Sequence, residues 1–166
     1  MNRRRFQSDL HEFPRAAREH DLSTTVSTIA RSELTKAHCL VIDAGNKNVY
    51  VPVLGGDIVM KLKFDPTTGR VSPDGPGEVA TKAGAGPRHL TFHPNGKFAY
   101  LITETTATIG TFAVDPASGT LNELQFVDTN QYKEQPTALD IHVSPDGKFL
   151  YGAERKMRLH HFQMKI

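Results

Sequence analysis

The stretch HPNGKFAYLITETTATIGTFAVDPASGTL, residues 93–121, decides the fold class of this chain. It recurs as DAGNKNVYVPVLGGDIVMKLKFDPTTGRV at 43–71 and, in shortened form, as SPDGKFLYGAERKMRLHHFQMKI at 144–166. The three tyrosines Tyr50, Tyr100 and Tyr151 fall in register in these copies. A period of about 50 residues is typical of β-propeller blades, so the repeat predicts an all-β propeller.

Together the copies carry the signals of a four-stranded blade, of which the shortened third copy holds the first three strands. Asn95-Gly96 and Asp146-Gly147 favour tight hairpins, because glycine accepts the positive φ that such turns require. The segments after them are rich in β-branched and aromatic residues, as strands are. The turns DPTTG and DPASG then lead into a fourth strand. We expect a partial β-propeller of about two and a half blades, which cannot close alone because propellers typically need about 4 to 8.

The chain divides into two parts by repeat and by charge. Residues 38–166 hold the blades, whereas residues 1–37 do not fit the repeat and are left as an unassigned segment, helical or disordered. Residues 1–37 carry seven Lys or Arg against five Asp or Glu, and residues 38–166 carry thirteen of each. A neutral main body argues against nucleic-acid binding, which requires clustered Lys and Arg.

The single cysteine bears on the cellular location. Cys39 cannot form an internal disulfide, so a cytoplasmic protein is expected. No apolar run approaches the roughly 20 residues that span a bilayer, so no membrane insertion is expected. Cys39 alternates away from His38 along its predicted strand and is expected to pack within the blade rather than act as a nucleophile.

The repeat also predicts a cluster of polar side chains. Arg88 lies 50 positions after His38, and Arg155 lies 51 positions after Glu104. His38 and Arg88 therefore open the first strand of successive blades, while Glu104 and Arg155 close the second strand. In a hairpin that turns at 95–96, Arg88 and Glu104 face each other within about one residue, where Cβ atoms are about 5 Å apart. We expect the four side chains at one mouth of the central channel.

The chemistry of these four residues suits a small anionic substrate. Guanidinium groups bind carboxylate or phosphate through paired hydrogen bonds, and a carboxylate or imidazole can take a proton from water. The alternative is that Arg88 and Glu104 form an ion pair that only locks the hairpin. No metal-ligand spacing is present among the histidines. His93 occupies a turn position and is expected to cap it, and Asp140 is expected to cap a strand or line the channel.

Three stretches resemble a known family: YVPVLGGDIV at 50–59, GAGPRHLTFHPNGKFAYLITE at 84–104 and LDIHVSPDGKFLYGAER at 139–155. From about His38 onward the sequence is similar to the lactonase family of seven-bladed propellers, which includes propeller-type 6-phosphogluconolactonases and carboxymuconate-lactonizing enzymes. The resemblance implies that His38, Arg88, Glu104 and Arg155 are the catalytic residues. It implies hydrolysis of a sugar lactone, namely 6-phosphogluconolactone in the pentose phosphate pathway, with no metal or organic cofactor.

Two other functions stay open at this stage. A cycloisomerase of the muconate type would use the same groups, with a substrate carboxylate attacking its own double bond. A non-enzymatic propeller segment would instead bind partners, or a second copy of itself, through the unpaired backbone groups of an open blade edge.

Overall fold

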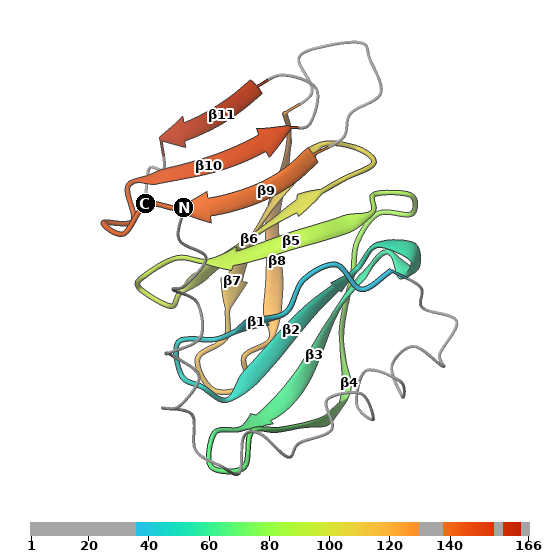
Figure 1. Ribbon diagram of the computed structural model, residues 1–166, viewed down its shortest axis with the longest axis vertical. Coiled ribbons are helices and arrows are strands. Elements are labelled where there is room, and N and C mark those ends of the chain that lie inside the picture. Colours follow the sequence, from blue (N-terminus) through green and yellow to red (C-terminus); the bar gives the residue numbers. More distant parts are fainter. Residues whose placement is uncertain (1–35, 130–137, 155–157, 164–166) are drawn as a thin grey trace, which may run out of the picture.

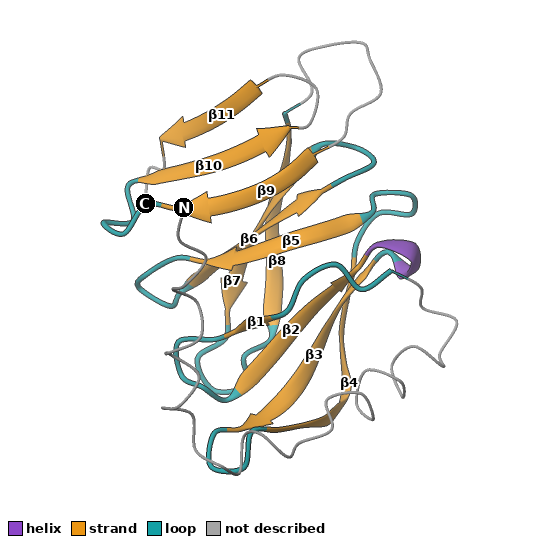
Figure 2. Ribbon diagram, in the orientation of Figure 1, coloured by secondary structure: helices purple, strands orange, loops and turns teal. Residues whose placement is uncertain are grey.

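The computed structural model describes residues 36–129, 138–154 and 158–163. Apart from a short 3₁₀ helix at Leu54–Gly56, its regular elements are β-strands (Figure 2). In chain order they are β1 (Val41–Ile42), β2 (Asn48–Val53), β3 (Ile58–Asp65), β4 (Arg70–Ala80), β5 (Pro87–Phe92), β6 (Phe98–Thr103), β7 (Thr108–Val114), β8 (Leu121–Asp128), β9 (Ala138–Val143), β10 (Phe149–Glu154) and β11 (Arg158–Gln163).

The strands form three sheets that correspond to the three sequence copies (Figure 1). The first blade has the order β1-β2-β3-β4, the second β5-β6-β7-β8, and the third β11-β10-β9. Neighbouring strands are antiparallel throughout the three sheets. The all-β, partial-propeller prediction is confirmed. In the described part of the chain the third blade ends after its third strand, as the repeat predicted.

The hairpins between the first and second strands follow the predicted turn chemistry. Gly96 and Gly147 have φ of 70° and 74°, a region that costs little without a Cβ atom. The first blade has Asn46 at the same position, with φ of 51°. Asparagine is one of the few other residues that adopt this conformation readily. The same turn is therefore retained in all three blades.

The turns between the third and fourth strands are held by an aspartate in each complete blade. Asp115 accepts hydrogen bonds from the backbone N–H of Ser118 at 2.7 Å and of Ala117 at 3.0 Å, and also from the Ser118 hydroxyl. The backbone N–H of Ser118 is the main reason that the pKa of Asp115 is below its ordinary value. Asp65 occupies the same place in the first blade and bonds Thr67 and Thr68. These aspartates hold the turns through local bonds and need no tertiary contact.

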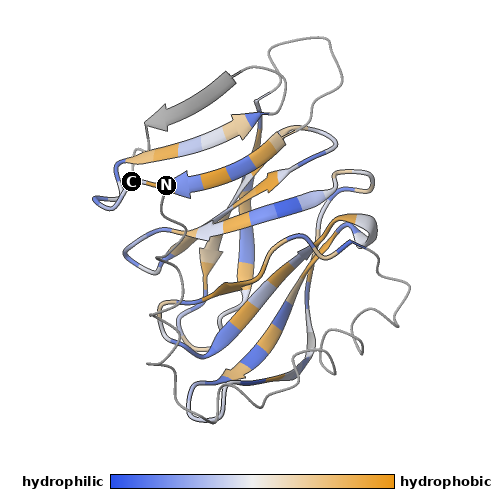
Figure 3. Cartoon of the chain, in the orientation of Figure 1, coloured by the Kyte–Doolittle hydropathy of each residue, from blue (hydrophilic) through white to orange (hydrophobic). Residues whose placement is uncertain are grey.

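The blades pack face to face through two apolar layers. Tyr50 from β2 and Tyr100 from β6, equivalent in the repeat, lie in successive layers. Figure 3 shows the alternation of hydrophobic and hydrophilic residues along β9, whereas β2 is buried on both faces, with Tyr50 in one apolar cluster and Val49, Val51 and Val53 in another. The layer between the first and second blades consists of Tyr50, Val59, Leu90, Ala99, Leu101, Phe112 and Leu121. The layer between the second and third consists of Tyr100, Ile102, Ala107, Ile109, Ala138, Ile141 and Leu150.

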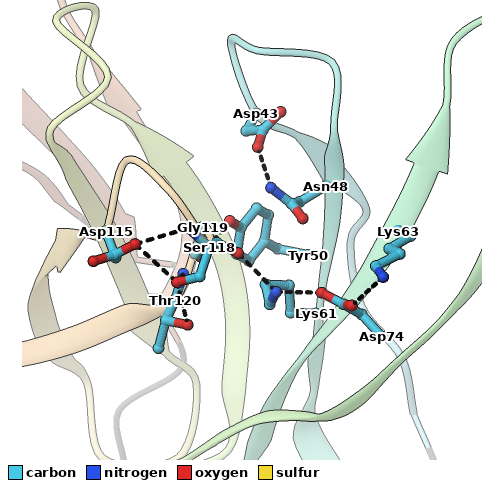
Figure 4. Close-up of polar contacts among 10 residues, drawn as sticks. All are labelled: Asp43, Asn48, Tyr50, Lys61, Lys63, Asp74, Asp115, Ser118, Gly119 and Thr120. Carbon is cyan, nitrogen blue, oxygen red and sulfur yellow. Dashed lines mark hydrogen bonds and ion pairs between the residues drawn. The ribbon is translucent and has the colours of Figure 1, made fainter.

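Polar contacts from the turns fix one blade against the next (Figure 4). The hydroxyl of Tyr50 donates to the backbone oxygen of Gly119 at 2.6 Å, and Lys61 donates to the backbone oxygen of Ser118 at 2.8 Å while it also pairs with Asp74. These contacts join the first blade to the β7–β8 turn of the second. The buried tyrosine hydroxyl thus finds a partner in the neighbouring blade, as buried polar groups must.

His93 makes the corresponding contact between the second and third blades. Its Nδ1 accepts from the backbone N–H of Asn95 at 3.1 Å, and its Nε2–H donates to the backbone oxygen of Gly147 at 3.0 Å. The first of these bonds confirms the predicted turn-capping role. The second was not predicted, because it depends on how two blades lie against each other.

Candidate functional site

The first strand of each blade is an edge strand of its sheet, and the first strands of successive blades are neighbours. Figure 1 shows β5 between β9 and the β1–β2 hairpin. His38 precedes β1, and the backbone there still pairs with β2: the His38 N–H donates to the Pro52 oxygen at 3.0 Å, and Ala37 bridges Val53. His38 is therefore held at the β1 edge of the first blade, next to β2.

A β-bulge orients Arg88 toward Glu104. In the β5–β6 ladder Pro87 pairs with Thr103 but His89 pairs with Ile102, so Arg88 is the extra residue. The backbone N–H of Glu104 donates to Gly86 rather than to Arg88, so the two residues are diagonal, not opposite within one residue as the sequence suggested. Bulges redirect side chains and are frequent beside functional sites. Here the bulge lets the Arg88 side chain reach Glu104 although the two residues are not paired directly across the strands.

Three of the four residues predicted from the repeat meet at one carboxylate oxygen. Nε of Arg88 donates to Oε2 of Glu104 at 2.7 Å, and Nε2 of His38 lies 3.6 Å from the same oxygen. The Arg88 side chain is 10% exposed and that of Glu104 is 25% exposed. Arg155, the fourth residue, lies outside the described residues. The cluster of His38, Arg88 and Glu104 is called the mouth cluster below.

The loop before Arg88 is held by an aspartate that sequence reasoning missed. Asp57, which has a left-handed backbone with φ of 51°, accepts hydrogen bonds from the N–H groups of Gly84 at 2.7 Å and Gly86 at 2.9 Å. Gly86 has φ of 65°, and a Cβ there would lie 2.5 Å from the Thr105 hydroxyl. These glycines form a tight turn that is fixed to the first blade. Asp57 therefore helps to set the position at which Arg88 enters its strand.

A second polar group adjoins the mouth cluster. The rings of His38 and His89 are in edge contact, with centroids 6.1 Å apart. Nδ1 of His89 donates to Oδ1 of Asp140 at 2.7 Å, and Nε2 of His142 donates to Oδ2 at 2.9 Å. Sequence reasoning considered His89 only as a metal ligand. The signal was nevertheless present, because Asp140 lies 51 positions after His89 and so occupies the same place on the next inner strand.

Burial and nearby charges shift the pKa values of Asp140 and of the neighbouring Cys39. Burial alone would raise the pKa of Asp140, but hydrogen bonds from His89, His142 and the Ile141 N–H outweigh it and lower the pKa. Burial raises the pKa of the Cys39 thiol, and the charge of Asp140 adds to the effect. A thiol that resists ionisation is a weak nucleophile. The expectation that Cys39 is packed in the blade agrees with its partly buried position.

The described residues offer protein side chains rather than a metal centre. Within 36–129, 138–154 and 158–163, no group of three or more His, Cys, Asp or Glu side chains is arranged to hold a metal ion. The mouth cluster instead combines a guanidinium, a carboxylate and an imidazole. Such a set can bind an anion, stabilise negative charge on an oxygen and accept a proton from water.

Comparison with known proteins assigns the family. The model of the lactonase family, described as a seven-bladed β-propeller, matches residues 9–163. The chain belongs to this family. The match begins well before His38, so it includes most of the segment that the repeat left unassigned.

Individual relatives agree with this family. A 6-phosphogluconolactonase from Pectobacterium carotovorum is 38% identical over 128 residues, which cover 76% of this chain and 38% of that protein. A Bacteroides uniformis protein, provisionally assigned as a 6-phosphogluconolactonase, has a solved structure with a TM-score of 0.71 at 33% identity, covering 78% of this chain and 37% of that one. The periplasmic gluconolactonase of Pseudomonas aeruginosa gives a TM-score of 0.71 at 30% identity, covering 78% and 37%. The chain thus spans less than two fifths of the length of these lactonases.

Proposed function

We propose that this chain supplies part of the active site of a sugar lactonase, with 6-phosphogluconolactone as substrate and 6-phosphogluconate as product. The observation that carries the proposal is the convergence of His38 and Arg88 on one oxygen of Glu104. These side chains come from two blades and from strand ends far apart in the sequence. Membership of the lactonase family supports the same reaction.

The mouth cluster divides the reaction between binding and proton transfer. Arg88 uses Nε to hold Glu104, which leaves its terminal nitrogens as donors for the substrate. They stabilise the oxyanion that forms when water attacks the lactone carbonyl. Glu104 or His38 takes the proton of that water. Arg155 is assigned to substrate binding on the repeat spacing and the family resemblance.

The approach of His38 to Glu104 supports a binding role over a purely structural ion pair. An ion pair that locks a hairpin needs only the two partners, whereas His38 is brought to the same carboxylate from the preceding blade. That third side chain comes from outside the β5–β6 hairpin. A muconate-type cycloisomerase would use the same groups, and the names of the relatives favour the lactonase.

Substitution of Arg88 tests the proposal. Arg88→Ala is expected to lower kcat for 6-phosphogluconolactone hydrolysis by about 10²- to 10³-fold, the loss usual for an oxyanion donor. Arg70→Ala, in an exposed residue at the start of β4, is the matched control and should change little. Circular dichroism checks that both variants fold. If the unsubstituted chain hydrolyses the lactone and Arg88→Ala is equally active, this role is excluded, and activity on a muconate substrate alone would favour the cycloisomerase.

The cellular location of the protein and its self-association are further parts of the proposal. We retain a cytoplasmic location as a prediction from the single cysteine, although one similar solved structure is that of a periplasmic enzyme. No helix within the described ranges is long and apolar enough to span a bilayer. Association through open blade edges also stays a prediction, and measurement of the molecular mass in solution tests it.

A further inference from the structure

We propose that His89 is the acid of the lactone reaction and that Asp140 is the residue that positions it. This inference rests on the proposed lactonase function and extends it, because neither the repeat nor the family resemblance gave either residue a part in the reaction. It starts from the bond between His89 on β5 and Asp140 on β9, which joins the inner strands of two blades.

The location of His89 suits a part in the same reaction. Its ring is in edge contact with the ring of His38, whose Nε2 lies 3.6 Å from Glu104. A substrate bound by Arg88 would therefore border His89 as well. The His89 side chain is partly buried, which limits its motion, but it retains access to solvent.

Asp140 determines which ring nitrogen of His89 faces the reaction. Because a carboxylate only accepts hydrogen bonds, the 2.7 Å contact requires a proton on Nδ1 of His89. Within the described residues nothing forms a hydrogen bond with Nε2. The pair thus has the arrangement in which a carboxylate fixes the tautomer and orientation of a catalytic imidazole. The Ile141 N–H and His142 complete the shell that holds the carboxylate.

The reaction needs an acid as well as a base. When water adds to the lactone carbonyl, its proton passes to Glu104 or His38. The acyl C–O bond of the ring then breaks, and its electron pair remains on the ring oxygen. Protonated His89 gives its Nε2 proton to that oxygen, and the carboxylate of Asp140 stabilises the imidazolium before transfer. Solvent returns the proton from the base to His89, and the product acid ionises, so atoms and charge balance.

Several charged or ionisable side chains lie near His89, and their charges affect its protonation in any experiment. They are His38 from the segment before β1, Cys39 beside it, Arg88 and Glu104 at the hairpin, and Asp140 with His142 on β9. His142 bonds the second oxygen of Asp140 but is exposed. It therefore provides the matched control for loss of a partner of Asp140.

The first test reads the tautomer of His89 in the whole chain and does not depend on activity. Long-range ¹H–¹⁵N NMR of the neutral ring should show the proton on Nδ1. Asp140→Ala removes the acceptor and should move the proton to Nε2, while His142→Gln should leave it on Nδ1. A proton on Nε2 in the unsubstituted chain, or no response to Asp140→Ala, overturns the positioning role.

The second test separates this inference from the proposed function. His89→Asn keeps a donor near Asp140 but removes Nε2, so kcat for 6-phosphogluconolactone should fall by about 10²-fold or more, while KM changes little. Full kcat in His89→Asn with loss of activity in Arg88→Ala would overturn the acid role and leave the lactonase proposal intact. If the unsubstituted chain does not hydrolyse the lactone, the proposed function and the acid role both fail for this chain, and the tautomer alone decides whether Asp140 positions His89.

Discussion

The bond between Arg88 and Glu104 should be measurable as a coupling free energy. A double-mutant cycle of Arg88→Met and Glu104→Gln, followed by urea unfolding, isolates the interaction from the other effects of each substitution. The two side chains are 10% and 25% exposed, and the donor and acceptor are 2.7 Å apart. A hydrogen bond between charged groups contributes about 1.5 to 3 kcal/mol. Because Glu104 is partly solvated, we expect a coupling of about 1 to 2 kcal/mol.

A second ion pair in the same chain provides the reference. Lys148 and Asp146 are 3.7 Å apart, and their side chains are 73% and 51% exposed. Such a surface pair typically contributes about 0 to 1 kcal/mol, so its cycle should give the smaller coupling. The reasoning is refuted if the Arg88–Glu104 coupling is no larger than that of Lys148–Asp146. That result would mean that the bulge does not hold the two groups together in solution.

Other predictions concern the turns. Tyr50→Phe loses the buried bond to the next blade and should lower the free energy of unfolding by about 1 kcal/mol. Gly119→Ala places a Cβ 2.5 Å from the Asn48 amide and 2.7 Å from the Tyr50 hydroxyl, so it should destabilise more than Gly84→Ala, where φ is also positive but nothing lies within 4 Å; equal losses would show that backbone strain alone matters. The pKa of Asp115 is lowered in the fold, so its contribution is present above the ordinary value of 3.8 and is lost as the pH falls further. The free energy of unfolding should therefore fall less between about pH 5 and pH 2 in Asp115→Asn than in the unsubstituted chain. The same pH dependence in both proteins would contradict this.

Features that repeat locally could be predicted from the sequence. Gly96 and Gly147 marked hairpins because a positive φ leaves few other choices, and the 50-residue spacing placed Arg88 and Glu104 at the ends of adjacent strands. The first prediction depends on backbone chemistry within one hairpin, and so does the pairing of Arg88 with Glu104 across the turn at 95–96. His38 was found from the 50-residue spacing, since an equivalent residue in the previous blade must lie on the equivalent strand.

Contacts between blades were harder to predict, because they depend on how one twisted sheet lies against another. Asp57 holds the loop that leads to Arg88, but its bonds to Gly84 and Gly86 cross from one blade to the next. The bulge at Arg88 was also missed, although Gly86 and Pro87 stand directly before it, because those residues were interpreted only as a turn entering the strand. His89 and Asp140 could have been paired by the 51-residue offset, had that offset been applied to neighbouring inner strands as well as to the predicted catalytic residues.

A crystal structure of the chain soaked with 6-phosphogluconate tests the central claim most directly. The claim is that side chains from two blades form one binding site for a lactone and its product. We expect the ligand in contact with Arg88 and within reach of Glu104 and His38, with His89 beside it. Product bound elsewhere on the chain, or a His38 side chain distant from Glu104, would contradict the account.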